Sequence, residues 1–88
     1  MTSTTLPTVW PRTGNDLVDR LMTTAFGRPR DPRSYPYKLG TFSLLVSRVT
    51  DAPLAHPYAP GTVDFDAFHA GVDEGRAIWT RHHAEAAQ

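Results

Sequence analysis

The sequence predicts an all-α fold: a short N-terminal helix packed on an antiparallel helix hairpin with a long Pro-rich connecting loop. Three segments repeat apolar residues at helical spacing, each follows a side chain suited to an N-cap, and proline and glycine gather between the segments. We expect a flexible arm at 1–14, a single helical domain at 15–84 and a frayed tail at 85–88.

The expected arm is rich in Thr and Pro and has no apolar period. Its one aromatic residue is Trp10. Two interpretations stay open for this side chain. It folds back onto a small core, or it anchors a partner, because exposed Trp is favoured at binding hot spots.

The first helix is expected at 16–26. Asn15 is a good N-cap, Gly27 ends the apolar period, and Pro29 prevents the helix from resuming. One stripe of six residues is expected to face the core: Leu17, Val18, Leu21, Met22, Ala25 and Phe26.

The second helix is expected at 35–50, with Ser34 or Tyr35 as its cap and Pro36 in its first turn. Leu39, Phe42, Val46 and Val49 fall at helical spacing. A strand over 41–49 is the alternative, because β-branched and aromatic residues are common in strands. We favour the helix, since the chain offers no clear second strand for pairing.

The third helix is expected at 63–84, after a stiff loop at 51–62 that holds three prolines. Thr62 is the expected N-cap, and acidic residues follow it in the first turn. Gly71 and Gly75 each cost a helix about 1 kcal/mol relative to Ala. Close approach of another helix, through Gly40, would offset that cost. A groove for a partner or a second copy is the alternative.

The core of the hairpin is expected to combine large side chains from the second helix, the connecting loop and the third helix. These are Phe42, Val46, Tyr58, Phe68, Val72 and Trp79.

Length and composition exclude several classes of protein. The chain has 88 residues, which suits one domain, and it has no Cys for disulfides or thiolate chemistry. It shows neither a secretory leader nor an apolar run long enough for a membrane span. We therefore expect a cytoplasmic protein.

Catalytic and cofactor motifs are absent from the sequence. There is no Gly-rich phosphate loop, and no Ser lies in a nucleophile-elbow setting. No two of the four His are four residues apart, the spacing of a helical zinc site. We expect a binding protein with no enzymatic activity, no cofactor and no metal.

The charges are unevenly distributed although the formal net charge is zero. The stretch 28–48 is basic, and the stretch 51–74 is acidic, so two opposed faces are expected. The candidate nucleic-acid-binding residues are Arg28, Arg30, Arg33, Tyr35, Tyr37, Lys38 and Arg48. The candidate residues of a protein-partner face are Trp10, Asp64, Asp66, Gly71, Asp73 and Gly75.

Three short motifs occur within 37–81: Tyr37-Lys38-Leu39-Gly40, then His56-Pro57-Tyr58, then an aromatic, Gly and acidic run over 68–76. Together they resemble the ribosome modulation factor family and its relatives among short phage and prophage proteins. The resemblance covers about half of the chain. It implies two antiparallel helices joined by a Pro-Tyr loop, and a role directed at RNA or the ribosome for the positive residues.

Three functions remain open. The first is a binder of RNA or of a ribonucleoprotein surface, in which Tyr35 and Tyr37 stack on bases beside the cations. The second is an inhibitor from a phage or mobile element, of the anti-CRISPR or anti-defence type, that binds a protein through an acidic helix face. The third is a homodimer whose Gly71 and Gly75 face mates with itself.

Overall fold

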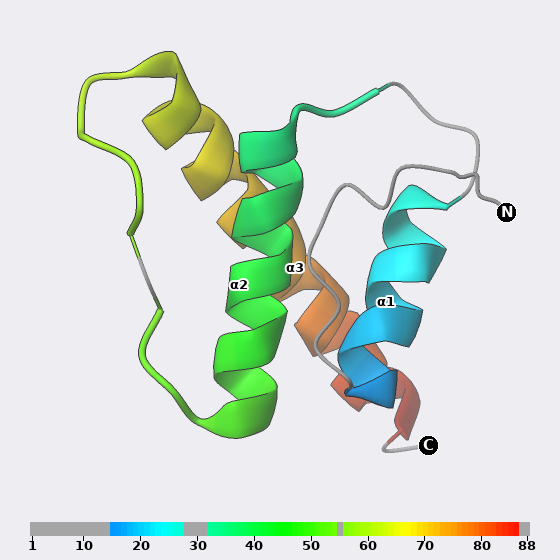
Figure 1. The fold of residues 1–88 in the computed structure, drawn as a ribbon. Coiled ribbons are helices and arrows are strands. Elements are labelled where there is room, and N and C mark those ends of the chain that lie inside the picture. Colours follow the sequence, from blue (N-terminus) through cyan, green and yellow to red (C-terminus); the bar gives the residue numbers. More distant parts are fainter. Residues whose placement is uncertain (1–14, 28–31, 55, 87–88) are drawn as a thin grey trace, which may run out of the picture.

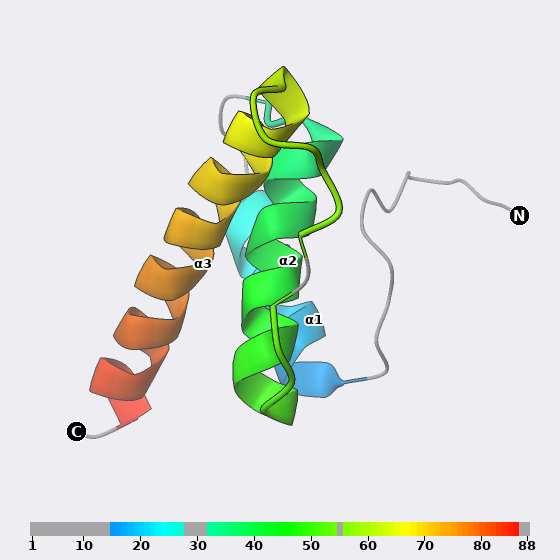
Figure 2. The same ribbon diagram turned by 90° about the vertical axis from the view of Figure 1, so that its left-hand side faces the viewer.

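The computed structural model describes residues 15–27, 32–54 and 56–86, and these residues form an all-α fold (Figure 1). Three helices follow one another along the chain: α1 (Asp16–Phe26), α2 (Tyr35–Thr50) and α3 (Val63–Ala86). Helix α2 packs against both of the others and shares its larger interface with α3 (Figure 2).

The predicted helix starts are confirmed by their caps. The side chain of Asn15 accepts a hydrogen bond from the backbone N–H of Val18, and Ser34 caps α2 in the same way. The hydroxyl of Thr62 accepts the backbone N–H of Phe65, 3.0 Å away. Each side chain satisfies one backbone donor that a helix start leaves without an intrahelical partner.

The predicted helix ends need one adjustment. Helices α1 and α2 end where predicted, and the segment 41–49 is helical, so the alternative of a strand is wrong. Helix α3 runs to Ala86, two residues further than predicted, which makes part of the expected tail helical.

Helices α2 and α3 pack as a hairpin, but the predicted antiparallel direction is wrong. A Cβ on Gly40 would meet Phe68 and Val72, and a Cβ on Gly75 would meet Thr41 and Leu44. Higher residue numbers in α2 therefore lie beside higher numbers in α3, and the two helices run in the same direction (Figure 1).

The connecting loop makes the parallel arrangement possible. Helix α2 has 16 residues, so the chain must travel back about 24 Å before α3 can start beside the start of α2. The twelve positions 51–62 can span about 40 Å when extended. Pro53, Pro57 and Pro60 favour such an extended path by restricting the residues before them.

The core lies between the three helices. Its buried apolar side chains are Val18, Met22, Ala25, Leu44, Leu45, Phe68, Val72 and Ile78. Of the six core residues predicted for the hairpin, Phe68 and Val72 are buried. The other four pack on the margin of this cluster: Phe42, Val46, Tyr58 and Trp79.

The face that α2 turns to the core differs from the predicted one. The buried residues of α2 are Gly40, Thr41, Leu44 and Leu45. Gly40 determines this face, because only a residue without a side chain lets the backbone of α3 come so close. The four residues predicted to face the core lie at the two margins of that contact and are only partly buried: Leu39, Phe42, Val46 and Val49.

Candidate functional site

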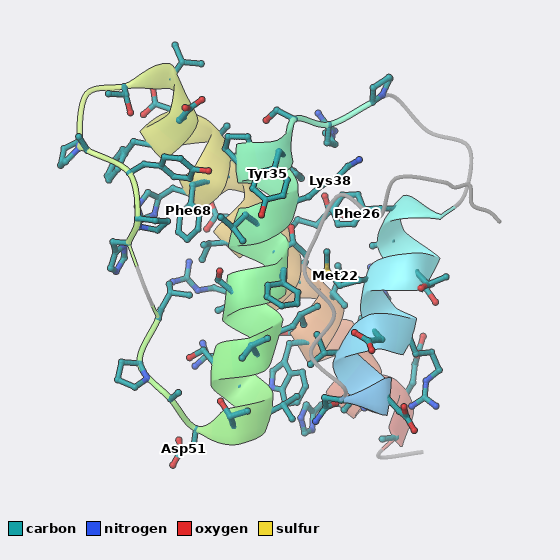
Figure 3. The ribbon with its side chains drawn as sticks, viewed as in Figure 1. Met22, Phe26, Tyr35, Lys38, Asp51 and Phe68 are labelled. Atoms are coloured by element: carbon teal, nitrogen blue, oxygen red, sulfur yellow. The ribbon has the colours of Figure 1, made fainter. Side chains whose placement is uncertain are left out.

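The predicted basic residues that the structure describes gather mainly where α1 ends and α2 begins. Arg33, Tyr35, Tyr37 and Lys38 fall within six consecutive positions there, and we call this set the basic corner. Figure 3 labels two of them, Tyr35 and Lys38, at the end of the molecule where Phe26 of α1 also lies. The guanidinium carbon of Arg33 is 4.9 Å from the centre of the Tyr37 ring, and Lys38 Nζ is 5.9 Å from that of Phe26. Such cation–π contacts restrain both charged side chains.

Tyr37 supports the basic corner from within. Its hydroxyl donates a hydrogen bond to Glu74 Oε1 on α3, 2.5 Å away, and its ring meets the edge of Phe26 at 6.3 Å. The side chain is half-buried under these contacts, so it does not offer an open ring face to a base. The expected stacking role therefore falls to Tyr35, which is 46% exposed.

The remaining predicted nucleic-acid-binding residues are not placed in the basic corner. Arg48 lies ten residues beyond Lys38 on α2, which is about 15 Å along the helix axis. It belongs to the opposite end of the molecule, near Asp51 (Figure 3). Arg28, Arg30 and Trp10 lie outside the described residues.

Two of the predicted acidic residues lie at the same end of the molecule as the basic corner. Asp64 and Asp66 are exposed in the first turn of α3, and α3 starts beside the start of α2 because the two helices are parallel. The main cause that raises the pKa of Tyr58 is burial of its hydroxyl, and the charges of Asp64 and Tyr35, which lie nearby, raise it further. This end of the molecule therefore holds charges of both signs, with the cations on the side next to α1 and the carboxylates on α3.

The other predicted partner-face residues do not extend this surface. Gly71 and Gly75 are buried beneath α2. That face is already occupied within the molecule, so it is not open to a second copy. Asp73 is exposed, and its carboxylate pairs with Arg76 at 2.9 Å, which reduces its charge at the surface.

A cluster of aromatic and histidine side chains was not predicted. The rings of His56 and His69 stack with centroids 5.3 Å apart, and Phe65 lies 4.3 Å from His69. His69 Nε2 is buried without a hydrogen-bond partner. The cluster attaches the middle of the 51–62 loop, at His56, to α3. Within the described ranges, no three His, Asp or Glu side chains group as a metal site.

A hollow between α1 and the second half of α3 was also not predicted. Its volume is about 270 Å³, and its apolar lining comes from Leu21, Ala25 and Ile78. Charged side chains of both signs stand around it: Glu74, Arg81 and Glu85. The sequence of neither helix predicts this hollow, because the hollow depends on how α1 lies across α3.

Comparison with known proteins finds no matching family model, no similar curated protein and no similar solved structure. The resemblance to ribosome modulation factors is therefore carried by the residues quoted above alone. No helix in the described part of the chain is long and apolar enough to cross a membrane.

Proposed function

We propose that this chain is a non-catalytic binding protein that attaches to the RNA of a ribonucleoprotein, such as the ribosome, through its basic corner. One observation carries the proposal. Arg33 precedes the exposed residue Tyr35 by two positions and Lys38 follows it by three, and neither cation is ion-paired with a carboxylate among the described residues.

The charge around the corner suits phosphate groups. The first turn of α2 contains no acidic residue, unlike the first turns of α1 and α3. Backbone N–H groups at a helix start and the helix dipole both favour an anion there. Arg28 and Arg30, which lie just before the described part of this loop, add two cations in sequence.

The exposed ring favours unpaired RNA over a duplex. Stacking of a base on an aromatic side chain is worth about 1–3 kcal/mol, and it needs a base that is not already stacked between neighbours. Loops and single strands offer such bases, whereas an A-form helix does not. One exposed ring and two restrained cations suit a short single-stranded contact.

The test is binding of a fluorescently labelled single-stranded RNA, measured by anisotropy at two salt concentrations. Arg33→Glu with Lys38→Glu is expected to weaken binding by about tenfold or more and to flatten the salt dependence. Arg48→Glu is the matched control, because it removes an exposed cation of the same helix at the other end. The proposal fails if the double variant and the control bind alike.

A second candidate function is inhibition of a protein target, as phage or mobile-element inhibitors of the anti-CRISPR or anti-defence type do. Exposed Asp64 and Asp66, beside Val63 at 83% exposure, favour it. An apolar side chain between carboxylates suits a basic protein surface better than RNA. A pull-down from bacterial lysate with and without RNase separates the two functions. A protein partner that survives RNase and is lost in Asp64→Lys with Asp66→Lys would replace the RNA proposal.

A further inference from the structure

Two large apolar side chains among the described residues are exposed, and both lie at one end of the molecule. Tyr35 is the first residue of α2, and Val63 is the first residue of α3. The parallel arrangement of the two helices brings these first turns to the same end (Figure 1). Exposed apolar groups gathered beside charged ones are typical of an interaction surface.

The charges at this end have opposite signs on its two sides. Arg33 and Lys38 lie on the side next to α1, where they contact Tyr37 and Phe26. Asp64 and Asp66 lie on the α3 side. The ring of Tyr58 lies 5.7 Å from that of Phe68 on α3, and Tyr58 is close enough to Asp64 and Tyr35 for both to raise its pKa. We call this whole surface the bipolar end.

We propose that the bipolar end binds a second copy of this chain in a twofold dimer. A twofold axis that lies in the interface, perpendicular to the line joining the two sides, brings each side of one copy onto the opposite side of the other. A surface that is positive on one side and negative on the other is therefore complementary to itself. Arg33 and Lys38 of each copy face Asp64 and Asp66 of the other, around an apolar centre of Tyr35 and Val63.

The dimer is expected to be weak and sensitive to salt. One end of an 88-residue chain is smaller than a standard stable interface, so association should need protein concentrations on the order of 10 µM or above. Exposed ion pairs at its rim are screened by salt. The dimer would cover the basic corner, so a second copy and RNA would exclude each other. This inference does not depend on RNA binding.

The test is sedimentation equilibrium of the full chain, without RNA, over a range of protein concentrations at low and high salt. The wild type is expected to approach the mass of a dimer at low salt and to dissociate at high salt. Arg33→Glu with Lys38→Glu, and separately Asp64→Lys with Asp66→Lys, should each remain monomeric. An equimolar mixture of the two variants should restore the dimer, because it restores complementary charges across the axis.

Charge reversal at the opposite end of the molecule provides the matched control. The control variant, Arg48→Glu with Glu85→Lys, should associate as the wild type does, and circular dichroism confirms that every variant is folded. A wild type that stays monomeric at all concentrations overturns the proposal. So does a mixture that stays monomeric while the wild type dimerises. A wild type that dimerises at high concentration but binds no RNA at concentrations where it is monomeric would refute the proposed function alone.

Discussion

Gly40 and Gly71 let α2 and α3 touch backbone to backbone. A Cβ on Gly40 would lie 2.0 Å from the carbonyl oxygen of Phe68, and one on Gly71 would lie 1.9 Å from that of Tyr37. Neither position can hold a side chain unless the helices move apart. This contact determines which face of α2 is buried and how far α3 stands from it.

The first prediction concerns this contact. Gly71→Ala should destabilise the fold by about 2–4 kcal/mol, because overlap with backbone atoms outweighs the roughly 1 kcal/mol that Ala gains in helix propensity. Urea unfolding followed by circular dichroism measures the change. Ala70→Leu adds more volume at the neighbouring exposed position and should change stability by only about 0.5 kcal/mol.

Gly75 provides a graded comparison within the same helix. Its Cβ would meet the Leu44 Cβ at 2.9 Å and the Thr41 carbonyl oxygen at 3.1 Å, so a small shift relieves the contact. Gly75→Ala should therefore destabilise the fold less than Gly71→Ala does. Equal effects at the two positions would contradict the role assigned to the backbone contact at Gly71.

A second prediction concerns Thr41, whose side chain is fully buried between the same helices. Its hydroxyl donates a hydrogen bond to the carbonyl oxygen of Gly71, 2.8 Å away. Thr41→Val keeps the shape and removes this bond, which should lower the free energy of unfolding by about 1 kcal/mol. Thr41→Ser keeps the hydroxyl and serves as the comparison for the lost methyl group. A Thr41→Val variant as stable as the wild type would show that the bond contributes nothing.

The sequence predicted the helices well because their signals are local. Asn15, Ser34 and Thr62 act within three residues of their own position, and prolines and glycines mark the loops. The close approach of α2 and α3 was also predicted, because the helix-propensity cost of Gly71 and Gly75 needs an offset, although a groove for a partner was the alternative. Local signals of this kind do not depend on the fold of the rest of the chain.

The direction of α3 was not predictable from the same signals. An antiparallel pair and a parallel pair need the same helices, and only the path of the 51–62 loop separates them. That path decides which residues meet. It pairs Tyr37 with Glu74 and brings Asp64 to the end that holds Arg33. Contacts between residues this far apart in sequence carry no spacing rule, so most of the candidate site had to come from the structure.

A third prediction concerns alkaline pH. Burial, and then the charges of Asp64 and Tyr35, raise the pKa of Tyr58 above its ordinary value of 10.0. The unfolded chain therefore releases this proton at a lower pH than the folded protein does. The contribution of protonated Tyr58 to the free energy of unfolding is therefore fully present below about pH 10, and it is lost as the pH rises further. Tyr58→Phe should reduce the fall in melting temperature above pH 10. If the melting temperatures of the wild type and of Tyr58→Phe fell equally above pH 10, Tyr58 would not be the group responsible for the loss of stability.

A fourth prediction concerns Asp51, which follows the last residue of α2 with a φ of 60°. This left-handed conformation is strained for residues with a side chain and unstrained for glycine. Asp51→Gly should therefore raise the free energy of unfolding by about 0.5–1 kcal/mol, and Asp51→Ala should lower it. Thermal unfolding of the two variants measures both changes. Stabilisation by Ala as well as by Gly would indicate that charge, not backbone conformation, is the cause.

The fifth prediction separates two tyrosines that are two residues apart in the basic corner. Tyr37 is held by Glu74 and covered by Arg33, whereas Tyr35 is exposed. Tyr35→Ala should weaken binding of single-stranded RNA by about 1–3 kcal/mol and leave the melting temperature nearly unchanged. Tyr37→Phe should lower the melting temperature and leave RNA affinity nearly unchanged, because it removes a hydrogen bond inside the fold. Anisotropy and thermal unfolding of both variants test the pair. The reverse pattern would mean that Tyr37 leaves Glu74 to meet the RNA, and that the basic corner rearranges on binding.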